Sequence, residues 1–297
     1  MYRILYNPLS AHGQGKLRAQ ELRDVLDGKE FTFVDIREIS DYKSFLEEFT
    51  ADDAIVIAGG DGTLNRFINN IDELALENDV YYYAVGSGND FYHDVSLEPN
   101  KLIKINSYIT DLPIVEVNGI RRRFLNGIGY GIDGYCCEQG DKVSIAAEKP
   151  VNYTAIAIKG FMFYYKPTNA KVTVDGVTKR YSHVWLAPSM NGRYYGGGMM
   201  IAPGQDRMDP EKKLTSVVFH RSGKLKTMMV LLSVFKGEHV KYTKNISIEK
   251  GHRITVEFDR PTALQIDGET VLDVTTYTVY SAAALAAEKR MAEKQKA

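Results

Sequence analysis

Cysteine is scarce in this sequence: Cys136 and Cys137 are the only two among 297 residues, and they are adjacent. Adjacent cysteines strain a mutual disulfide and lack the spacing of a metal-binding set, which excludes a disulfide scaffold and a zinc fold. The chain also lacks an apolar leader after Met1 and any uninterrupted apolar run of about 18 residues. These absences predict a cytoplasmic protein that meets a membrane only from outside.

Neither sign of charge dominates, because 37 lysines and arginines oppose 38 aspartates and glutamates. A net charge of −1 provides no global basic field, which argues against nucleic acid as a partner. The six histidines lack the spacing of metal ligands. A content of 44% hydrophobic and 25% charged residues is typical of a folded globular protein, and the length favours two domains with a cleft.

The first 110 residues alternate short apolar runs with helical periods, which is typical of a parallel sheet covered by helices. Amphipathic spacing predicts one helix over residues 42–49 behind a Ser40 cap, and a second over residues 64–71. Such sheets bind ligands in the loops at the carboxyl ends of their strands, so these loops are the candidate sites. The predicted strands are Tyr2–Tyr6, Phe31–Ile36, Ala54–Ala58 and Val80–Val85.

From residue 111 the pattern changes to strands joined by turn pairs such as Asp267-Gly268. It predicts a mainly antiparallel β domain over residues 111–275, with helices near residues 151–165 and 225–235. The polar tail from Ala282 predicts a terminal helix. The segment 276–297, which includes a strand at Tyr277–Tyr280, could return to the first domain or stay with the second.

Glycines gather directly after the predicted strand Ala54–Ala58, in the loop Gly59-Gly60-Asp61-Gly62-Thr63. Glycines let a backbone approach a polyphosphate, and the N–H groups at the start of the next helix supply donors for it. The loop therefore predicts a phosphate site, whereas a plain strand-to-helix turn needs fewer glycines. Asp61 beside phosphates requires either a linking Mg²⁺ or a role in orienting the loop.

Two further loops follow predicted strands of the same sheet. Gly86-Ser87-Gly88-Asn89-Asp90 ends in an amide and a carboxylate that could meet a nucleotide and its magnesium, although ordinary turns share this composition. Asn7-Pro8 opens a polar loop up to Gly15, which suits a ribose and phosphates or merely caps a helix.

Together the three loops resemble the diacylglycerol kinase catalytic domain family, which also contains sphingosine and ceramide kinases. That family has an Asn-Pro loop, a Gly-Gly-Asp-Gly-Thr loop and a Gly-Thr-Gly-Asn-Asp loop in this order, with Ser87 standing here for the threonine. The resemblance extends to the small soluble bacterial enzymes over nearly the whole chain. It continues through Asp111-Leu112-Pro113, Asn126 to Asp133, Gly196-Gly197-Gly198, Ala202-Pro203 and Gln265-Ile266-Asp267-Gly268-Glu269.

The resemblance implies an α/β nucleotide-binding domain of the NAD kinase/diacylglycerol kinase type, over residues 1–110, followed by a β-sandwich domain. It implies ATP and Mg²⁺ as cofactors, with ATP in the cleft. Asp90, Asp111 and Glu269 would form the catalytic cluster, with Glu269 as general base; without the family, Asp-Gly-Glu describes a turn with a surface glutamate. The implied nucleotide-binding positions are Asn7, Ser10, Gly59, Gly60, Asp61, Gly62, Thr63, Ser87, Gly88 and Asn89.

Bacterial relatives hold a structural Mg²⁺ through an Asp-Asp-Gly segment after Ala-Pro. The corresponding stretch here keeps Asp209 as the implied metal ligand, but Met208 and Pro210 replace an aspartate and the glycine. Whether the ion binds at this segment stays open.

The implied reaction is phosphorylation of a lipid alcohol, diacylglycerol to phosphatidate, at the inner membrane surface, and relatives suggest a homodimer. The alternatives are a sphingoid or polyprenol kinase, an NAD kinase, or a non-catalytic nucleotide or lipid sensor on the same fold. An NAD kinase should carry a downstream Asn-Glu pair, where this chain has Gly86 to Asp90. Intact Asp90, Asp111 and Glu269 argue against a sensor.

Two stretches combine apolar side chains with lysines and could bind a membrane surface. They are residues 159–166, and residues 225–235 with Lys224, Lys226 and Lys236 beside them. The alternative is that both apolar faces belong to the core. In the second stretch, Leu225, Met228, Met229 and Leu232 are predicted to share one helix face.

Overall fold

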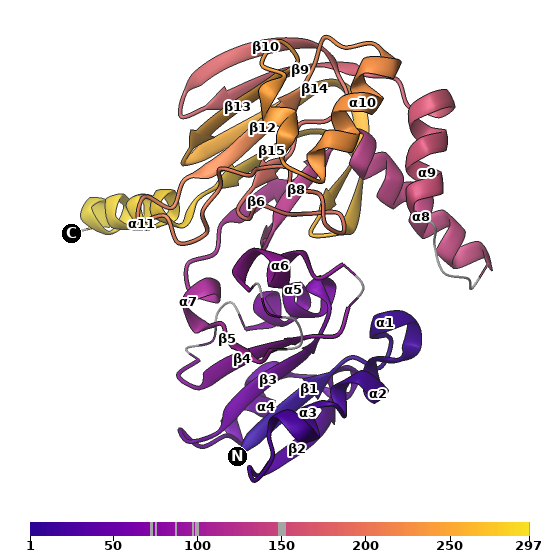
Figure 1. The fold of residues 1–297 in the computed structure, drawn as a ribbon. Coiled ribbons are helices and arrows are strands. Elements are labelled where there is room, and N and C mark those ends of the chain that lie inside the picture. The colour runs from indigo at the N-terminus through magenta and orange to yellow at the C-terminus, as the bar shows by residue number, and fades with distance from the viewer. Residues whose placement is uncertain are drawn as a thin grey trace. The chain divides into compact units, whose positions relative to one another are not determined.

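The computed structural model describes residues 1–296 except 72, 73, 75, 87, 97, 99, 100 and 148–152. Its internal contacts divide the chain into two compact units, Met1–Asp111 and Leu112–Ala297, which Figure 1 shows in indigo to purple and in magenta to yellow. The predicted α/β domain followed by a mainly antiparallel β domain is confirmed.

The first unit is built on a five-stranded sheet in the order β2-β1-β3-β4-β5. β1, β2, β3 and β4 are mutually parallel, and the short β5 runs antiparallel to β4. The central strands are apolar on both faces because helices cover them, and Ile4, Leu5 and Ile55 are fully buried. The strands are β1 (Tyr2–Tyr6), β2 (Phe31–Asp35), β3 (Ala54–Gly59), β4 (Asp79–Ala84) and β5 (Ile103–Lys104).

Two helix starts in the first unit differ from the sequence prediction. The cap of α4 is Asp41 rather than Ser40, because the Asp41 carboxylate accepts a hydrogen bond from Ser44 N at 2.9 Å. α5 begins at Asp61, three residues before Leu64, so the glycine loop itself forms the first turn of the helix. The helices are α1 (Ser10–Gly13), α2 (Gly15–Ala19), α3 (Leu22–Val25), η1 (Ile36–Glu38), α4 (Tyr42–Glu47), α5 (Asp61–Asn70), α6 (Asp90–Val95) and α7 (Asn106–Ile109).

The second unit contains a ten-stranded antiparallel sheet in the order β13-β12-β11-β8-β14-β15-β6-β7, with β9 on β14 and β10 on β9. The long β14 pairs with β9 along its first half and with β8 along its second, so one strand joins both parts of the sheet. Its core includes the stacked rings of Tyr130 and Phe258. The strands are β6 (Ile114–Val117), β7 (Ile120–Arg123), β8 (Gly127–Tyr130), β9 (Thr168–Val174), β10 (Val177–Val184), β11 (Ser189–Met190), β12 (Leu214–Phe219), β13 (Ile246–Gly251), β14 (Arg253–Ile266) and β15 (Glu269–Tyr280).

The C-terminal segment belongs to the second unit, because β15 pairs with β14 and β6. The other possibility, a return to the first domain, is therefore wrong. A long helix at Ile132–Ala147 was not predicted, and the predicted helix start at Val151 lies outside the described residues. The helices of this unit are α8 (Ile132–Ala147), α9 (Tyr153–Lys159), the π-helical turn η2 (Gly160–Tyr164), α10 (Lys224–Val234), η3 (Glu238–Lys241) and α11 (Ala282–Lys296).

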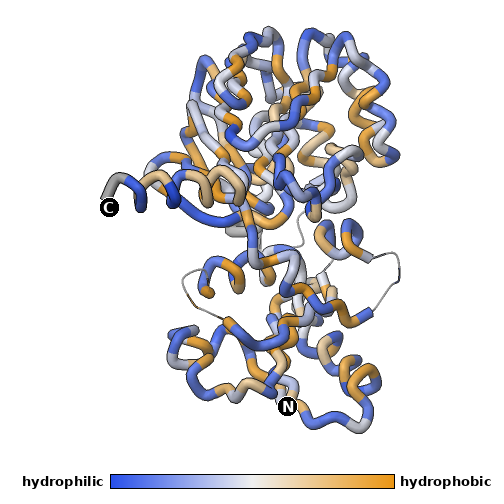
Figure 2. Tube along the Cα trace, turned by 90° about the vertical axis from the view of Figure 1, so that its left-hand side faces the viewer, coloured by the Kyte–Doolittle hydropathy of each residue, from blue (hydrophilic) through white to orange (hydrophobic). Residues whose placement is uncertain are grey.

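Hydropathy is interleaved along the trace, with apolar and polar residues alternating through both units (Figure 2). Across the described ranges, no helix has both the length and the apolar character needed to cross a bilayer.

Candidate active site

The loop after β3 places a helix N-terminus at the carboxyl edge of the parallel sheet. Gly60 caps α5, and its carbonyl accepts hydrogen bonds from Thr63 N at 3.0 Å and Leu64 N at 3.1 Å. Gly62 lies in the first turn, where an added Cβ would meet no atom within 4 Å. The backbone at Gly62 is thus uncovered, next to N–H groups and the positive end of the helix dipole, which suits an anion.

The loops after β3 and β4 touch through their glycines. A Cβ on Gly86 would lie 2.5 Å from the Cα of Gly60, a separation that real Cβ atoms do not show. The Gly59 carbonyl also accepts hydrogen bonds from Val85 N and from the buried Tyr82 hydroxyl, both at 3.0 Å. Glycine at position 86 is therefore required for the two loops to pack together.

The Asp61 carboxylate fastens the first glycine loop to the start of α6. Its two oxygens accept hydrogen bonds from the backbone N–H groups of Asp90 at 2.8 Å and Phe91 at 2.9 Å. These donors are orphan groups of a helix N-terminus, which a carboxylate stabilises. Of the two roles considered for Asp61, these contacts match the orienting one.

The Asn-Pro loop after β1 joins the same network through Thr63. Asn7 Nδ2 donates to Thr63 Oγ1 at 3.1 Å, and the Ser10 hydroxyl lies 3.4 Å from the same oxygen. Thr63 is buried. Asn7 and Ser10, two predicted nucleotide-binding residues of the first loop, are thus both within hydrogen-bond reach of Thr63, a third one from the second loop.

The third loop is described except for Ser87, which lies outside the described residues. Asn89 takes the left-handed conformation, with a φ of 50°, and its Nδ2 donates to Gly86 O at 2.7 Å. Its Oδ1 is buried and has no hydrogen-bond partner among the described residues. Asp90 follows as the first residue of α6 and is 6% exposed. This loop presents carboxylate and amide oxygens, which are the ligands that Mg²⁺ prefers.

In the second unit, the Asp267-Gly268 turn joins β14 to β15 and holds the segment before β8. The Asp267 carboxylate accepts hydrogen bonds from three consecutive backbone N–H groups, at 2.5 to 2.9 Å. Gln265 Oε1 accepts a further one from Gly268 N at 2.6 Å. The turn is therefore fixed by its own side chains. The three donors to Asp267 are Leu125, Asn126 and Gly127.

Glu269 begins β15 directly after this turn and forms an ion pair with Arg122 of β7. Its side chain is 51% exposed. Asp111, the third predicted catalytic residue, is an exposed residue at the end of the first unit. The three predicted catalytic positions thus divide between the units, with Asp90 and Asp111 in the first and Glu269 in the second.

Family comparisons agree with both units. The diacylglycerol kinase catalytic domain matches residues 1–115, and the YegS C-terminal NAD kinase beta sandwich-like domain matches residues 126–286. The second match alone covers more than half of the chain. The chain belongs to the diacylglycerol kinase-like lipid kinase family.

Individual relatives are distant but cover most of the chain. The diacylglycerol kinase of Mycobacterium tuberculosis H37Rv is 25% identical over 266 residues, which span 85% of this chain and 84% of that one. The diacylglycerol kinase of Bacillus subtilis is 25% identical over 75% of this chain and 72% of its own length. The crystal structure of a diacylglycerol kinase from Bacillus anthracis aligns with a TM-score of 0.59 at 17% identity, covering 95% and 94% of the two chains, which supports the fold alone.

Asp133 is a further candidate functional residue of this lipid kinase family member. It ends the motif from Asn126 to Asp133, in which the sequence assigned it no role. It lies in α8, and its carboxylate accepts hydrogen bonds from the Tyr195 hydroxyl at 2.8 Å and from Gly134 N at 3.0 Å. Burial raises the pKa of Asp133 to about 6, against the smaller opposing effect of the Tyr195 hydrogen bond. Carboxyls perturbed in this way are enriched at functional sites. The sequence signal that could have identified Asp133 is its position at the end of a glycine-rich, apolar run.

The segment around Asp209 is a turn stabilised by its own aspartates. Asp209 Oδ1 accepts from Glu211 N at 3.0 Å, and Asp206 Oδ1 accepts from Met208 N at 2.8 Å. Arg207 between them binds Leu125 O and the Asn126 side chain. Where the chain is described, no group of three acidic, histidine or cysteine side chains could hold a metal. Asp209 as a metal ligand stays a prediction.

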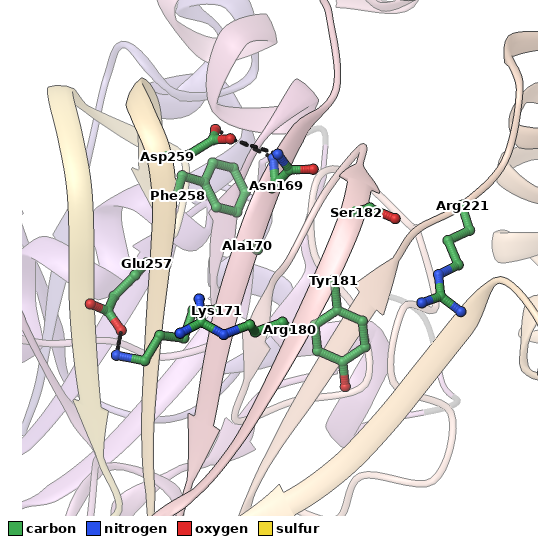
Figure 3. A pocket seen from close by; sticks show the side chains of 10 residues that line it. All are labelled: Asn169, Ala170, Lys171, Arg180, Tyr181, Ser182, Arg221, Glu257, Phe258 and Asp259. Carbon is green, nitrogen blue, oxygen red and sulfur yellow. Dashed lines mark hydrogen bonds and ion pairs between the residues drawn. The ribbon is translucent and has the colours of Figure 1, made fainter.

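A cavity of about 500 Å³ in the second unit is lined mainly by residues of β9, β10 and β14, and none of its lining residues is a predicted site residue (Figure 3). Half of its lining residues are charged: Lys171 pairs with Glu257 at 2.7 Å, and Asp259 accepts a hydrogen bond from Asn169 at 2.8 Å.

Proposed function

We propose that this family member transfers the γ-phosphoryl group of ATP to the hydroxyl of a lipid alcohol, with diacylglycerol as acceptor and phosphatidate as product. The observation that carries the proposal is the start of α5, where the backbone at Gly62 is uncovered while Asp61 fixes the loop to α6. A rigid row of N–H donors beside a helix dipole is what the phosphates of a nucleotide require.

The residues proposed to bind the nucleotide all lie in loops of the first unit. In this proposal, the backbone after Gly60 binds the phosphates, and Asn7, Ser10 and Thr63 hold the adjoining loop in place. Asp90 and Asn89 supply oxygens that fit Mg²⁺, and Asn89 Oδ1 is buried with no hydrogen-bond partner among the described residues. When bound, Mg²⁺ would neutralise charge on the transferring phosphoryl group.

Glu269 is proposed to receive the proton. The lipid hydroxyl oxygen forms a bond to the γ-phosphorus, the bond from that phosphorus to the bridging oxygen breaks, and ADP leaves with the bonding electrons. The hydroxyl proton passes to the Glu269 carboxylate, which Arg122 orients through its ion pair. Asp111 is proposed to support this cluster.

The test is direct. Purified protein is incubated with labelled ATP, Mg²⁺ and a panel of acceptors in mixed micelles: diacylglycerol, a polyprenol, a sphingoid base and, without lipid, NAD. Labelled phosphatidate formed faster than any other product supports the proposal. Phosphorylation of NAD alone, or of no acceptor despite nucleotide binding, would refute it in favour of an NAD kinase or a sensor.

A further inference from the structure

Helix α10 buries one face and leaves an apolar stripe on the other. Thr227, Val230 and Val234 are buried against the core of the second unit. The opposite face carries four exposed apolar side chains. They are Leu225 at 73%, Met229 at 61%, Leu232 at 69% and Phe235, just past the helix, at 55% exposure. Met228, predicted to share this face, instead packs partly against the core, so the predicted face was wrong in that one position.

The turn η2 with the end of α9 adds a second exposed apolar group next to α10. Lys224 Nζ donates to Met162 O at 2.6 Å, which joins the two elements directly. Both also pack over one core, in which Phe161 of η2 and the following Tyr165 lie with Val230 and Val234 of α10. The exposed members here are Ile158, Met162, Phe163 and Tyr164. We call these eight exposed side chains the apolar surface.

The two segments that form the apolar surface carry charge of one sign. Segments 153–166 and 224–236 contain five lysines and no aspartate or glutamate, in a chain whose net charge is −1. All five lysines are exposed, and none forms an ion pair with a described residue. They are Lys159, Lys166, Lys224, Lys226 and Lys236.

The exposed apolar side chains and the five lysines together indicate which kind of partner this surface binds. Soluble monomers seldom leave so many large apolar side chains together without covering them. A second copy is a poor occupant, because a two-fold interface would bring both sets of five lysines onto the same patch. An anionic bilayer satisfies both, since apolar side chains enter the headgroup boundary while lysines reach the lipid phosphates.

We propose that the apolar surface docks this kinase on an anionic lipid bilayer. The inference deepens the proposed function, and rests on it, because a lipid acceptor lies in the bilayer. The surface is built by α10, Phe235 just past it, η2 and the end of α9, and it can be altered without changing any residue assigned to nucleotide binding or proton transfer.

Vesicle co-sedimentation tests the docking. The triple variant Leu225→Ser/Met229→Ser/Leu232→Ser removes the stripe, and Lys226→Ser/Lys236→Ser removes charge while sparing the Lys224 contact. A matched control, Val177→Ser/Leu272→Ser, replaces exposed apolar side chains elsewhere in the unit. Partitioning onto phosphatidylcholine vesicles containing phosphatidylglycerol should fall about tenfold or more for each docking variant, and not for the control. Without phosphatidylglycerol, the wild type should bind weakly.

Two further measurements decide the remaining outcomes. Vesicle binding by the triple variant equal to that of wild type overturns the docking. The docking is also overturned if analytical ultracentrifugation shows a dimeric wild type and a monomeric triple variant, because the apolar surface then binds a second copy. A water-soluble short-chain diacylglycerol separates this failure from failure of the proposed function. The docking variants should phosphorylate it at the wild-type rate while losing activity on long-chain diacylglycerol in vesicles. A wild type that binds vesicles but phosphorylates neither substrate refutes the function and leaves the docking standing.

Discussion

Two loops, one in each unit, use an aspartate beside glycine in the same way and then differ in what they present. Asp61 holds the N–H groups of Asp90 and Phe91, and Asp267 holds three N–H groups that begin at Leu125. After Asp61 the chain offers a helix start with no side chain at Gly62, whereas after Asp267 it offers Glu269. The same anchoring therefore leaves a donor surface for an anion in one unit and a carboxylate in the other.

The largest effect should come from the carboxylate. Glu269→Gln keeps the size of the side chain but loses its basicity, so kcat should fall by roughly 10²–10⁴-fold. ATP affinity, measured by calorimetry, should stay near that of wild type. Asp273→Asn on the same strand is the control for loss of an exposed charge. Near wild-type turnover in Glu269→Gln would mean that the turn before Glu269 has only a structural role.

The donor surface is best tested at Gly62, because Gly60 packs against Gly86 and Gly62 faces open space. Gly62→Asp adds a negative charge that favours the first turn of α5 yet repels phosphates, so ATP affinity should drop by about 100-fold in a folded protein. Gly62→Ala, which adds volume without charge, should bind ATP nearly as wild type does. Equal ATP affinity in all three proteins would contradict the phosphate site.

The Asp133 carboxyl provides a test of whether its charged form lowers the folding stability of the second unit. A buried carboxyl with a folded pKa of about 6, above its ordinary value of 3.8, keeps its proton longer when folded. The folded state thus binds more protons between these values, so stability should fall as pH rises from about 4 to 6 and stay level above. Asp133→Asn should remove that fall and gain on the order of 2 kcal/mol at pH 7. Urea unfolding at a series of pH values measures it, and an unchanged slope would exclude this cost.

The anchoring aspartates should affect folding stability by an amount comparable to that expected for Asp133. Asp61→Asn and Asp267→Asn each replace a charged acceptor of backbone N–H groups, which should destabilise the protein by about 1–3 kcal/mol. The loss should be greater for Asp267, which accepts three hydrogen bonds where Asp61 accepts two. Denaturant unfolding gives both values. If Asp61→Asn stays fully stable yet loses magnesium-dependent activity, its orienting role is wrong and the metal-linked role is favoured.

The glycine loops could be predicted because their physics is local. Gly59 to Thr63 follows an apolar strand and opens a helix within ten residues, so turn, donors and dipole are all determined by neighbours in sequence. The alternation of strands and helices likewise predicted the parallel sheet. The cap at Asp41 was missed by one residue, because Ser40 and Asp41 are both good caps and only the entry angle of the chain selects between them.

Other features depended on partners far away in the chain. The donors to the Asp61 carboxylate lie 29 and 30 residues later, and those to Asp267 lie 140 to 142 residues earlier. Helix α10 is apolar on two faces, so its own pattern does not say which one is buried. By itself, the sequence determined the alternation of strands and helices in the first unit and the place of the glycine loop between β3 and α5, since both are set by near neighbours. Only the tertiary structure decided that Leu225, Met229 and Leu232 stay exposed, because Val230 and Val234 on the opposite face of α10 are the residues that join the buried core cluster of this unit.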